Sequence, residues 1–312
     1  MIFNRKAKPQ DEKRGLYAKL DELIEQKKYL PYINCHQNRI TSYQAGDIRS
    51  AFKGRGMELE EVRAYEFGDD VRDIDWRVTA RKGGTYTKIY SEEKDREVYV
   101  VLDLSPRMLF GTKKELKSVS ASKLAALLGW QSLANKDRFG LVLFDGYRTE
   151  IYKPKNNPKS LMAILKAVSD KSLSMLSNIK EDNISPTKSL SDPLQYLQYN
   201  LKSKAIVFII SDFYDFDDNV RKSLVSLTRK GRVYCANIYD VIEEIPPESG
   251  EYMVEYNKEK LIFDSNPDSF KDIYYHYFAA RRKGLERFCD RFGCQYIGVR
   301  TDRPLYKQLK IL

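Results

Sequence analysis

Carboxylate and hydroxyl side chains stand in this sequence where they could hold a divalent cation. One apolar run ends in Asp103, with Ser105 two residues later, and a second ends in a serine followed by Asp212. Thr187 offers another hydroxyl between them. Mg²⁺ takes oxygen ligands of these kinds and fills its other positions with water. The pattern therefore predicts a candidate metal site made of Asp103, Ser105, Thr187 and Asp212, with Mg²⁺ as the candidate cofactor.

The elements that would position these residues are strands of a parallel sheet. From Glu97 onward, apolar runs alternate with amphipathic segments, which is typical of a mostly parallel sheet with helices on both faces. We expect strands at residues 98–103, 139–144, 204–211, 232–239 and 295–299. We expect helices at residues 118–135, 158–168, 193–199, 219–230 and 270–292. Ligands bind such sheets at the carboxyl ends of the strands, so the loops after Leu102 and Ile210 are the expected location of the site.

The rest of the chain divides into two further parts. Residues 1–32 are expected to carry an N-terminal amphipathic helix, over residues 11–30, because leucines and isoleucines recur among charges at helical spacing. Pro31 is expected to stop it. Residues 33–96 contain short β-like runs separated by glycine-rich turns, which predicts a small β-rich lobe. Residues 97–312 form the α/β domain.

The two loops resemble the metal-ion-dependent adhesion site of von Willebrand factor type A domains. In those domains an Asp-x-Ser-x-Ser loop, a threonine and a later aspartate hold the cation, and an acidic side chain of the partner completes its coordination. Asp103, Ser105 and Asp212 match three of these positions, and Thr187 is the candidate for the threonine. Arg107 replaces the second serine, and a guanidinium cannot ligate a metal and repels a cation.

That departure leaves three alternatives open. The site binds a metal ion despite Arg107, or it is metal-free with Arg107 directed to solvent or paired with Asp103. In the third alternative, Asp103 and Asp212 only cap loops and neighbouring helices.

Residues 52–81 closely resemble the hallmark segment of domain-of-unknown-function family 58. The segment combines Arg-x-Tyr, Gly-Asp, Arg-x-x-Asp-Trp and Ala-Arg at close spacing, and the resemblance continues at residues 240–250 and covers nearly the whole chain. It implies a von Willebrand factor type A-like (Rossmann-like) fold: a mostly parallel sheet with helices on both faces, plus the N-terminal β-rich lobe.

Arginines and carboxylates alternate around one tryptophan in this hallmark segment. The composition suits ion pairs that dock the lobe onto the sheet domain. The alternative is a partner-binding surface anchored by the tryptophan and an arginine. The candidate partner-binding or lobe-docking residues are Arg63, Arg72, Asp75, Trp76, Arg81 and Arg107.

The resemblance also implies what the protein does and with what. Family members are typically encoded beside MoxR-type AAA+ ATPases, so the expected function is a non-enzymatic, chaperone-like protein-binding module that acts with such an ATPase on client proteins. The chain itself has no Gly-x-x-x-x-Gly-Lys-Ser/Thr loop for nucleotide phosphates.

Two other classes of function are weighed against this expectation. The first is a metal-dependent hydrolase or phosphotransferase that uses Asp103 and Asp212. The sequence lacks an Asp-x-Asp pair at the first loop and a Gly-x-Ser-x-Gly elbow, and it has only two histidines. The second is nucleic-acid binding, which the net charge of +10 and pI of about 9.1 would suit. No aromatic-interleaved basic motif accompanies that charge, so nucleic acid is not the expected partner.

Cysteine usage and hydropathy bound the cellular setting. The four cysteines are scattered along the sequence with only two histidines beside them, which predicts reduced thiols and no structural zinc site. No apolar run approaches the roughly 18 residues of a membrane helix, and the N-terminus lacks the apolar core of a signal peptide. We therefore expect a cytoplasmic bacterial protein without transmembrane segments.

Overall fold

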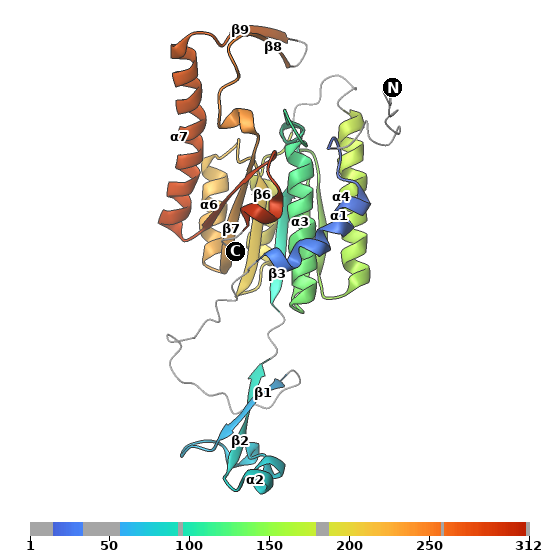
Figure 1. Ribbon diagram of the computed structural model, residues 1–312, viewed down its shortest axis with the longest axis vertical. Coiled ribbons are helices and arrows are strands. Elements are labelled where there is room, and N and C mark those ends of the chain that lie inside the picture. The colour runs from blue at the N-terminus through green and yellow to red at the C-terminus, as the bar shows by residue number, and fades with distance from the viewer. Residues whose placement is uncertain (1–14, 34–56, 93–95, 179–186, 257–258, 310–312) are drawn as a thin grey trace, which may run out of the picture. The chain divides into compact units, whose positions relative to one another are not determined.

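The computed structural model describes residues 15–33, 57–92, 96–178, 187–256 and 259–309 (Figure 1). The chain divides into two compact units. One comprises Gln37–Asp95, and the other comprises Met1–His36 together with Arg96–Leu312. None of the helices formed by the described residues has the length and apolar character that crossing a membrane requires.

A six-stranded sheet forms the centre of the larger unit. Its strand order is β10-β7-β6-β3-β4-β5. All neighbouring pairs are parallel except β4 and β5. The strands are β3 (Glu97–Asp103), β4 (Arg138–Phe144), β5 (Thr149–Lys155), β6 (Ala205–Ser211), β7 (Gly231–Tyr239) and β10 (Gln295–Arg300).

Helices cover both faces of this sheet, because successive side chains of a buried strand point to opposite faces. Val98, Val100 and Leu102 of β3 join a core cluster with side chains from one set of helices. Tyr99 and Val101 of the same strand join a second cluster with side chains from the other set. The first set is α1 (Leu20–Glu25), η1 (Gln26–Tyr32), α3 (Lys117–Ala134), α4 (Pro158–Asn178) and α8 (Leu305–Gln308); the second is α5 (Ser191–Asn200), α6 (Asp218–Thr228) and α7 (Asp268–Phe292) (Figure 1). The expected α/β fold class is confirmed.

The N-terminal helix is shorter than expected. Within residues 11–30, only α1 is α-helical among the described residues, and the chain continues as the 3₁₀ helix η1, which contains Pro31. Pro31 therefore does not stop the helical segment. Proline lacks a backbone N–H, so Pro31 removes one hydrogen-bond donor. The N–H of Ile33 still donates to the carbonyl of Leu30 (3.1 Å).

Three strands of the larger unit were not expected from the sequence. β5 lies at the sheet edge, where lysines and Pro154 interrupt any apolar alternation. β8 (Glu251–Tyr256) and β9 (Glu259–Asp264) form a separate antiparallel hairpin. Hydrophobic periodicity does not mark β5, in which only Pro154 is buried. In the hairpin, the apolar side chains of Met253 and Ile262 are exposed and mark no buried face.

The smaller unit pairs β1 (Met57–Ala64) with β2 (Tyr86–Glu92) in antiparallel fashion. Between them lie the 3₁₀ turn η2 (Val71–Asp73) and the helix α2 (Trp76–Lys82). The Asp75 side chain caps α2 by accepting from the N–H groups of Arg77 and Val78, and Gly83 ends the helix with a left-handed φ of 69°. Side-chain caps thus define a helix that carries little apolar character of its own.

Candidate functional site

The candidate site lies at the carboxyl ends of β3 and β6, where the strand order reverses. The chain passes from β3 to β4 on one side of the sheet and later reaches β6 on the other side of β3. Such a switch leaves an opening above the strand ends, because the two connections leave in opposite directions. Asp103, Ser105, Ser211 and Asp212 meet there and line a small cavity of about 20 Å³.

Asp103 is held in place by both of its carboxylate oxygens. Oδ1 accepts from the N–H of Ser105 (2.8 Å), and Oδ2 accepts from the Ser211 hydroxyl (2.6 Å). The residue is 4% exposed. Burial raises the pKa of Asp103 to about 6, and the nearby charge of Asp212 acts in the same direction. This carboxyl group therefore titrates close to neutral pH.

A buried lysine, which the sequence did not point to, supplies the positive charge at this site. The Lys117 Nζ atom lies 2.7 Å from Asp212 Oδ2 and 3.3 Å from Glu243 Oε1. The Lys117 side chain is only 4% exposed. Burial alone lowers the pKa of Lys117, but the charges of Asp212 and Glu243 and the hydrogen bonds to both outweigh that effect and raise it. The ammonium group stays charged and neutralises Asp212.

The turn after β6 aims Asp212 at Lys117. The N–H of Tyr214 donates to Asp212 Oδ1 (3.0 Å), which leaves Oδ2 for the lysine. Phe213, between them, has a φ of 47°, in the left-handed region that non-glycine residues rarely adopt. Its N–H donates to the Ser211 hydroxyl (3.2 Å), so hydrogen bonds on both sides hold the strained residue.

Arg107 lies beside the site but does not pair with Asp103. It belongs to the 3₁₀ turn η3 (Pro106–Met108), and its guanidinium donates to Asp215 and lies 4.3 Å from the ring centre of Tyr214. Arg281 of α7 lies over the same ring at 4.2 Å. Tyr214 is 49% exposed, so two arginines and an aromatic ring form an accessible group at the rim of the site.

Thr187 is not brought into the cavity. It is exposed, and its N–H donates to the carbonyl of Gly146 (3.1 Å). The next residue, Lys188, lines the cavity instead. The hydroxyl that the adhesion-site pattern requires from the third loop is thus replaced by a cationic side chain.

These residues do not fit a resident Mg²⁺ ion. Mg²⁺ keeps several waters in an octahedral shell, whereas a cavity of about 20 Å³ has room for about one water. Lys117 already neutralises Asp212, Arg107 is paired with Asp215, and Lys188 adds a further positive charge at the cavity. The Lys117 ammonium, 2.7 Å from Asp212 Oδ2, occupies the carboxylate oxygen that would otherwise be available to a cation.

A larger cleft adjoins the site between the ends of β6 and β7 and the helices α6 and α7. Its volume is about 410 Å³, and Asp212 and Glu243 lie in its wall. Arg221, Arg281 and Arg282 contribute positive charge to its lining. Aromatic side chains supply much of the rest of the wall, namely Phe213, Tyr214, Phe216, Tyr239 and Phe278.

The arginines of this cleft are paired to different degrees. Arg282 Nη1 lies 3.4 Å from Glu244 Oε1, and Arg221 pairs with the exposed Asp218 (3.2 Å). No carboxylate of the described residues pairs with Arg281, whose guanidinium stacks on Tyr214. Arg281 is therefore the cation of this cleft best placed to meet an incoming anionic group.

The hallmark residues belong to the smaller unit, and several of those that the structure describes form ion pairs within it. Arg63 contacts Asp69 (2.8 Å) and Glu66 (3.4 Å), and Asp75 lies 3.6 Å from Lys88. Backbone hydrogen bonds and the Lys88 charge lower the pKa of Asp75. Three further members, Arg72, Trp76 and Arg81, are exposed. Docking of the lobe onto the sheet domain stays a prediction.

Among the described residues, no histidine lies at the candidate site. His276 is on α7, exposed, with Nδ1 2.7 Å from the carbonyl of Asp272, and His36 lies outside the described residues. The Ser211 hydroxyl donates to Asp103 instead of standing free beside a base. Ser105 has no histidine partner in the part of the chain that the structure describes, and the side chain that contacts it is the Asp103 carboxylate.

The sequence matches one described family over most of its length. Residues 61–284 match the family described as "Protein of unknown function DUF58". The uncharacterized protein Rv1480 of Mycobacterium tuberculosis is 23% identical over 259 residues, which span 83% of this chain and 79% of that protein. The uncharacterized protein Mb1516 of Mycobacterium bovis matches with the same identity and coverage.

Solved structures show more distant similarity. An aerotolerance-related membrane protein of Bacteroides fragilis is 14% identical with a TM-score of 0.42, covering 69% of this chain and 96% of that one. BatB of Bacteroides thetaiotaomicron is 12% identical with a TM-score of 0.39, covering 68% and 93%. The von Willebrand factor type A domain of SpRpn10 is 10% identical with a TM-score of 0.37, covering 69% and 93%.

Proposed function

This chain belongs to the DUF58 family, and on that premise we propose that it is a non-enzymatic protein-binding module that recognises an acidic partner segment without a metal ion. The observation that carries the proposal is the Lys117 ammonium, buried 2.7 Å from Asp212. The fixed Lys117 ammonium group neutralises Asp212, which a metal ion would need as a ligand. Recognition can then rely on groups that are already in place, with no ion to be captured first.

The accessible charges around the site define the partner's chemistry. Arg107 and Arg281 meet at the exposed ring of Tyr214, and Lys188 lines the small cavity. Arginine beside an aromatic ring is a frequent energetic anchor of protein interfaces. Because Arg107 already donates to Asp215, a carboxylate of a partner would meet Arg281 and Lys188 directly, where the metal-containing adhesion sites use an ion between the two proteins.

The proposed partner is a MoxR-type AAA+ ATPase, with client proteins as further ligands. This part of the proposal rests on the family resemblance. It agrees with the sequence in one respect, since a chain without a phosphate-binding loop needs another protein for any ATP-driven step. The hydrolase alternative is less well supported, because Asp212 is paired with Lys117 and no histidine among the described residues lies at the cavity.

Calorimetric titration against the purified ATPase tests the proposal, with Mg²⁺ and nucleotide held constant because the ATPase itself requires them. Arg281→Ala should weaken binding by about tenfold to a hundredfold, the effect of losing an anchor worth roughly 2 kcal/mol. Arg229→Ala is the matched control, because this exposed arginine at the end of α6 does not line the cleft. Equal affinities for the two variants would show that this surface is not the binding site.

A second titration tests the metal-independent character. Mg²⁺ added to the protein alone should give no saturable heat with the wild type or with Arg107→Ser, because Lys117 remains beside Asp212. Saturable binding of Mg²⁺ by the wild type that Asp103→Ala abolishes would contradict the proposal.

A further inference from the structure

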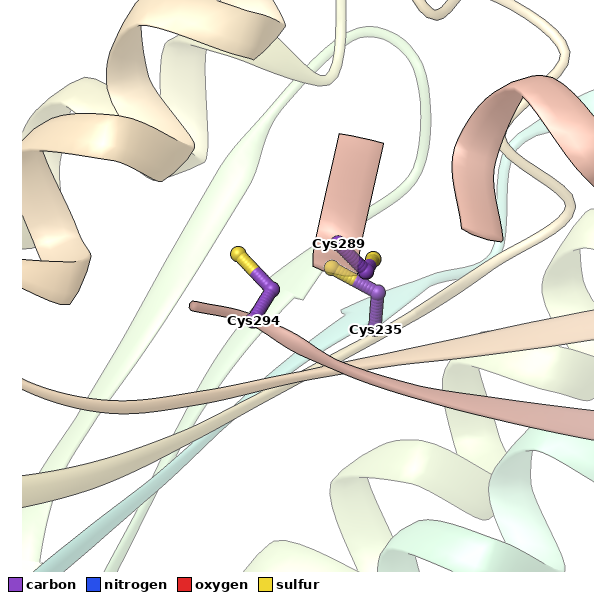
Figure 2. A group of neighbouring side chains, drawn as sticks. All are labelled: Cys235, Cys289 and Cys294. Atoms are coloured by element: carbon purple, nitrogen blue, oxygen red, sulfur yellow. The ribbon is translucent and has the colours of Figure 1, made fainter. Parts of the chain in front are cut away.

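Three cysteines that are far apart in the sequence meet in the interior of the larger unit. Their sulfur atoms all lie within 4.8 Å of one another (Figure 2). Cys235 and Cys289 are fully buried, and Cys294 is 6% exposed. The cysteines are scattered along the sequence, but the fold brings three of them together. The fourth cysteine, Cys35, lies outside the described residues.

Regular backbone structure fixes each of the three positions. Cys235 is in β7, and parallel pairing places it opposite Tyr296 of β10. Cys289 is in the last turn of α7, which ends at Gly293 with a left-handed φ of 74°. The N–H of Cys294 then donates to the carbonyl of Cys289 (3.0 Å), which closes the turn. A strand, a helix end and a tight turn hold the sulfurs together before any ligand binds.

The surroundings of the sulfurs are apolar. The three cysteines belong to the core cluster that also contains Leu224, Leu285 and other aliphatic side chains. Among the described residues, no histidine or carboxylate joins the three sulfurs as a potential ligand. Structural zinc takes four protein ligands, and Mg²⁺ and Ca²⁺ take oxygen, so neither class matches this donor set.

We infer that Cys235, Cys289 and Cys294 form a three-sulfur site for a soft, thiophilic metal ion of low coordination number, with Cu(I) as the best-matched probe. Thiolate ligands select soft ions, and a three-sulfur set in an apolar pocket needs no fourth ligand for such an ion. As each sulfur–metal bond forms, the corresponding thiol releases its proton to water. Neither the metal nor the sulfur changes oxidation state.

The three cysteines differ slightly in exposure. Cys294 is the most exposed member at 6%, whereas Cys235 and Cys289 are fully buried. Cys294 follows Gly293, beside which an added methyl group would meet no atom within 4 Å. The Cys294 side is therefore the least enclosed side of the cluster.

A bound ion would join three elements of the fold. It would fix the carboxyl-terminal end of α7 and the start of β10 against β7. The proposed site is separate from the partner surface, because its members do not line the cleft beside Asp212. Its test therefore does not depend on the proposed function.

The test is an anaerobic titration of the reduced, full-length protein with Cu(I) in competition with a chromophoric Cu(I) chelator. The wild type should take one equivalent of copper, and X-ray absorption at the copper edge should show three sulfur neighbours. Cys235→Ala, Cys289→Ala and Cys294→Ala should each lower the affinity by more than about a hundredfold, beyond the effect of mutating a group that only supports a ligand. Cys35→Ser is the matched control and should bind like the wild type.

Thermal unfolding of the same proteins keeps the result interpretable if an alanine variant is less stable. Copper should raise the Tm of the wild type and of Cys35→Ser, because a ligand that binds the folded state stabilises it, and should leave the Tm of Cys289→Ala unchanged. The inference is overturned if the folded wild type does not compete for copper, or if Cys35→Ser loses as much affinity as the cluster variants. It is equally overturned if two of the three cysteines form a disulfide in the isolated protein and the reduced form binds no copper.

Discussion

Replacing Lys117 by methionine tests the central feature of the site, the internal cation. Lys117→Met keeps the length of the side chain and removes its charge, which leaves Asp212 and Glu243 without their shared partner. Breaking a buried ion pair in this way costs about 3 to 5 kcal/mol of unfolding free energy. The Glu243 side chain is 16% exposed and keeps some hydration, so the lower end, about 3 kcal/mol, is expected.

The assay is urea unfolding followed by tryptophan fluorescence in a Trp76→Phe background. Trp130 then reports on the larger unit alone, since it is buried in α3 and its Nε1 donates to the carbonyl of Leu23 (3.1 Å). Lys117→Met combined with Asp212→Asn should lose less stability than the sum of the two single variants, by about 1 to 3 kcal/mol.

Further substitutions in the Lys117→Met background should make the site bind a metal ion. Replacing Arg107 and Lys188 by serine in the Lys117→Met background should allow Mg²⁺ to raise the unfolding midpoint, because the cationic side chains around Asp103 and Asp212 are then removed. A loss below about 1 kcal/mol for Lys117→Met would place its ion pairs in the range of surface salt bridges and refute the reasoning. Stabilisation of the wild type by Mg²⁺ would also refute the reasoning, because the site would then bind a metal ion with Lys117 in place.

The remaining predictions concern protonation and packing. The folded-state pKa of Asp103 is raised to about 6, above its unfolded value, so the folded protein binds the extra proton and loses stability as the pH rises through this window. The unfolding free energy of Asp103→Asn relative to wild type should therefore increase by about 2 kcal/mol between pH 4 and pH 7, measured by urea titration, and a pH-independent difference would disprove the shift. Gly231→Ala should cost about 2 kcal/mol or more, because its methyl group would lie 2.1 Å from the carbonyl oxygen of Ala205; an unchanged midpoint would contradict that contact. Gly284→Ala, in the middle of α7 with nothing within 4 Å of the added methyl, should stabilise the protein by up to about 1 kcal/mol, seen as a higher Tm.

Local patterns predicted the framework of the larger unit well. The five strands and the five helices expected after Glu97 all form, whereas the helix expected over residues 11–30 is α-helical only at Leu20–Glu25 among the described residues. Buried strands and amphipathic helices show their burial as a hydrophobic pattern within a short stretch of sequence. The helix expected at residues 158–168 continues to Asn178, since its apolar face persists beyond the first turns. The edge strand β5, in which only Pro154 is buried, left no such pattern.

The candidate site was only partly readable from the sequence. Asp103, Ser105 and Asp212 could be placed at strand ends and do come together. Thr187 was chosen for its hydroxyl, but the loop exposes it and presents Lys188 instead. The available signal for Lys117 was a lysine in the first turn of a helix that is otherwise nearly all small or apolar, and that signal does not say which carboxylates the lysine will meet.

The sequence by itself determined the class of the fold, the strand ends that carry carboxylates and the family hallmark, because each of these is encoded within a few dozen neighbouring residues. The tertiary structure alone decided what stands beside those carboxylates. Lys117 meets Asp212 across 95 residues of sequence, and Cys235 meets Cys289 and Cys294 across a sheet pairing. Such contacts depend on strand order and helix placement, which burial of the whole core selects and which no local periodicity specifies.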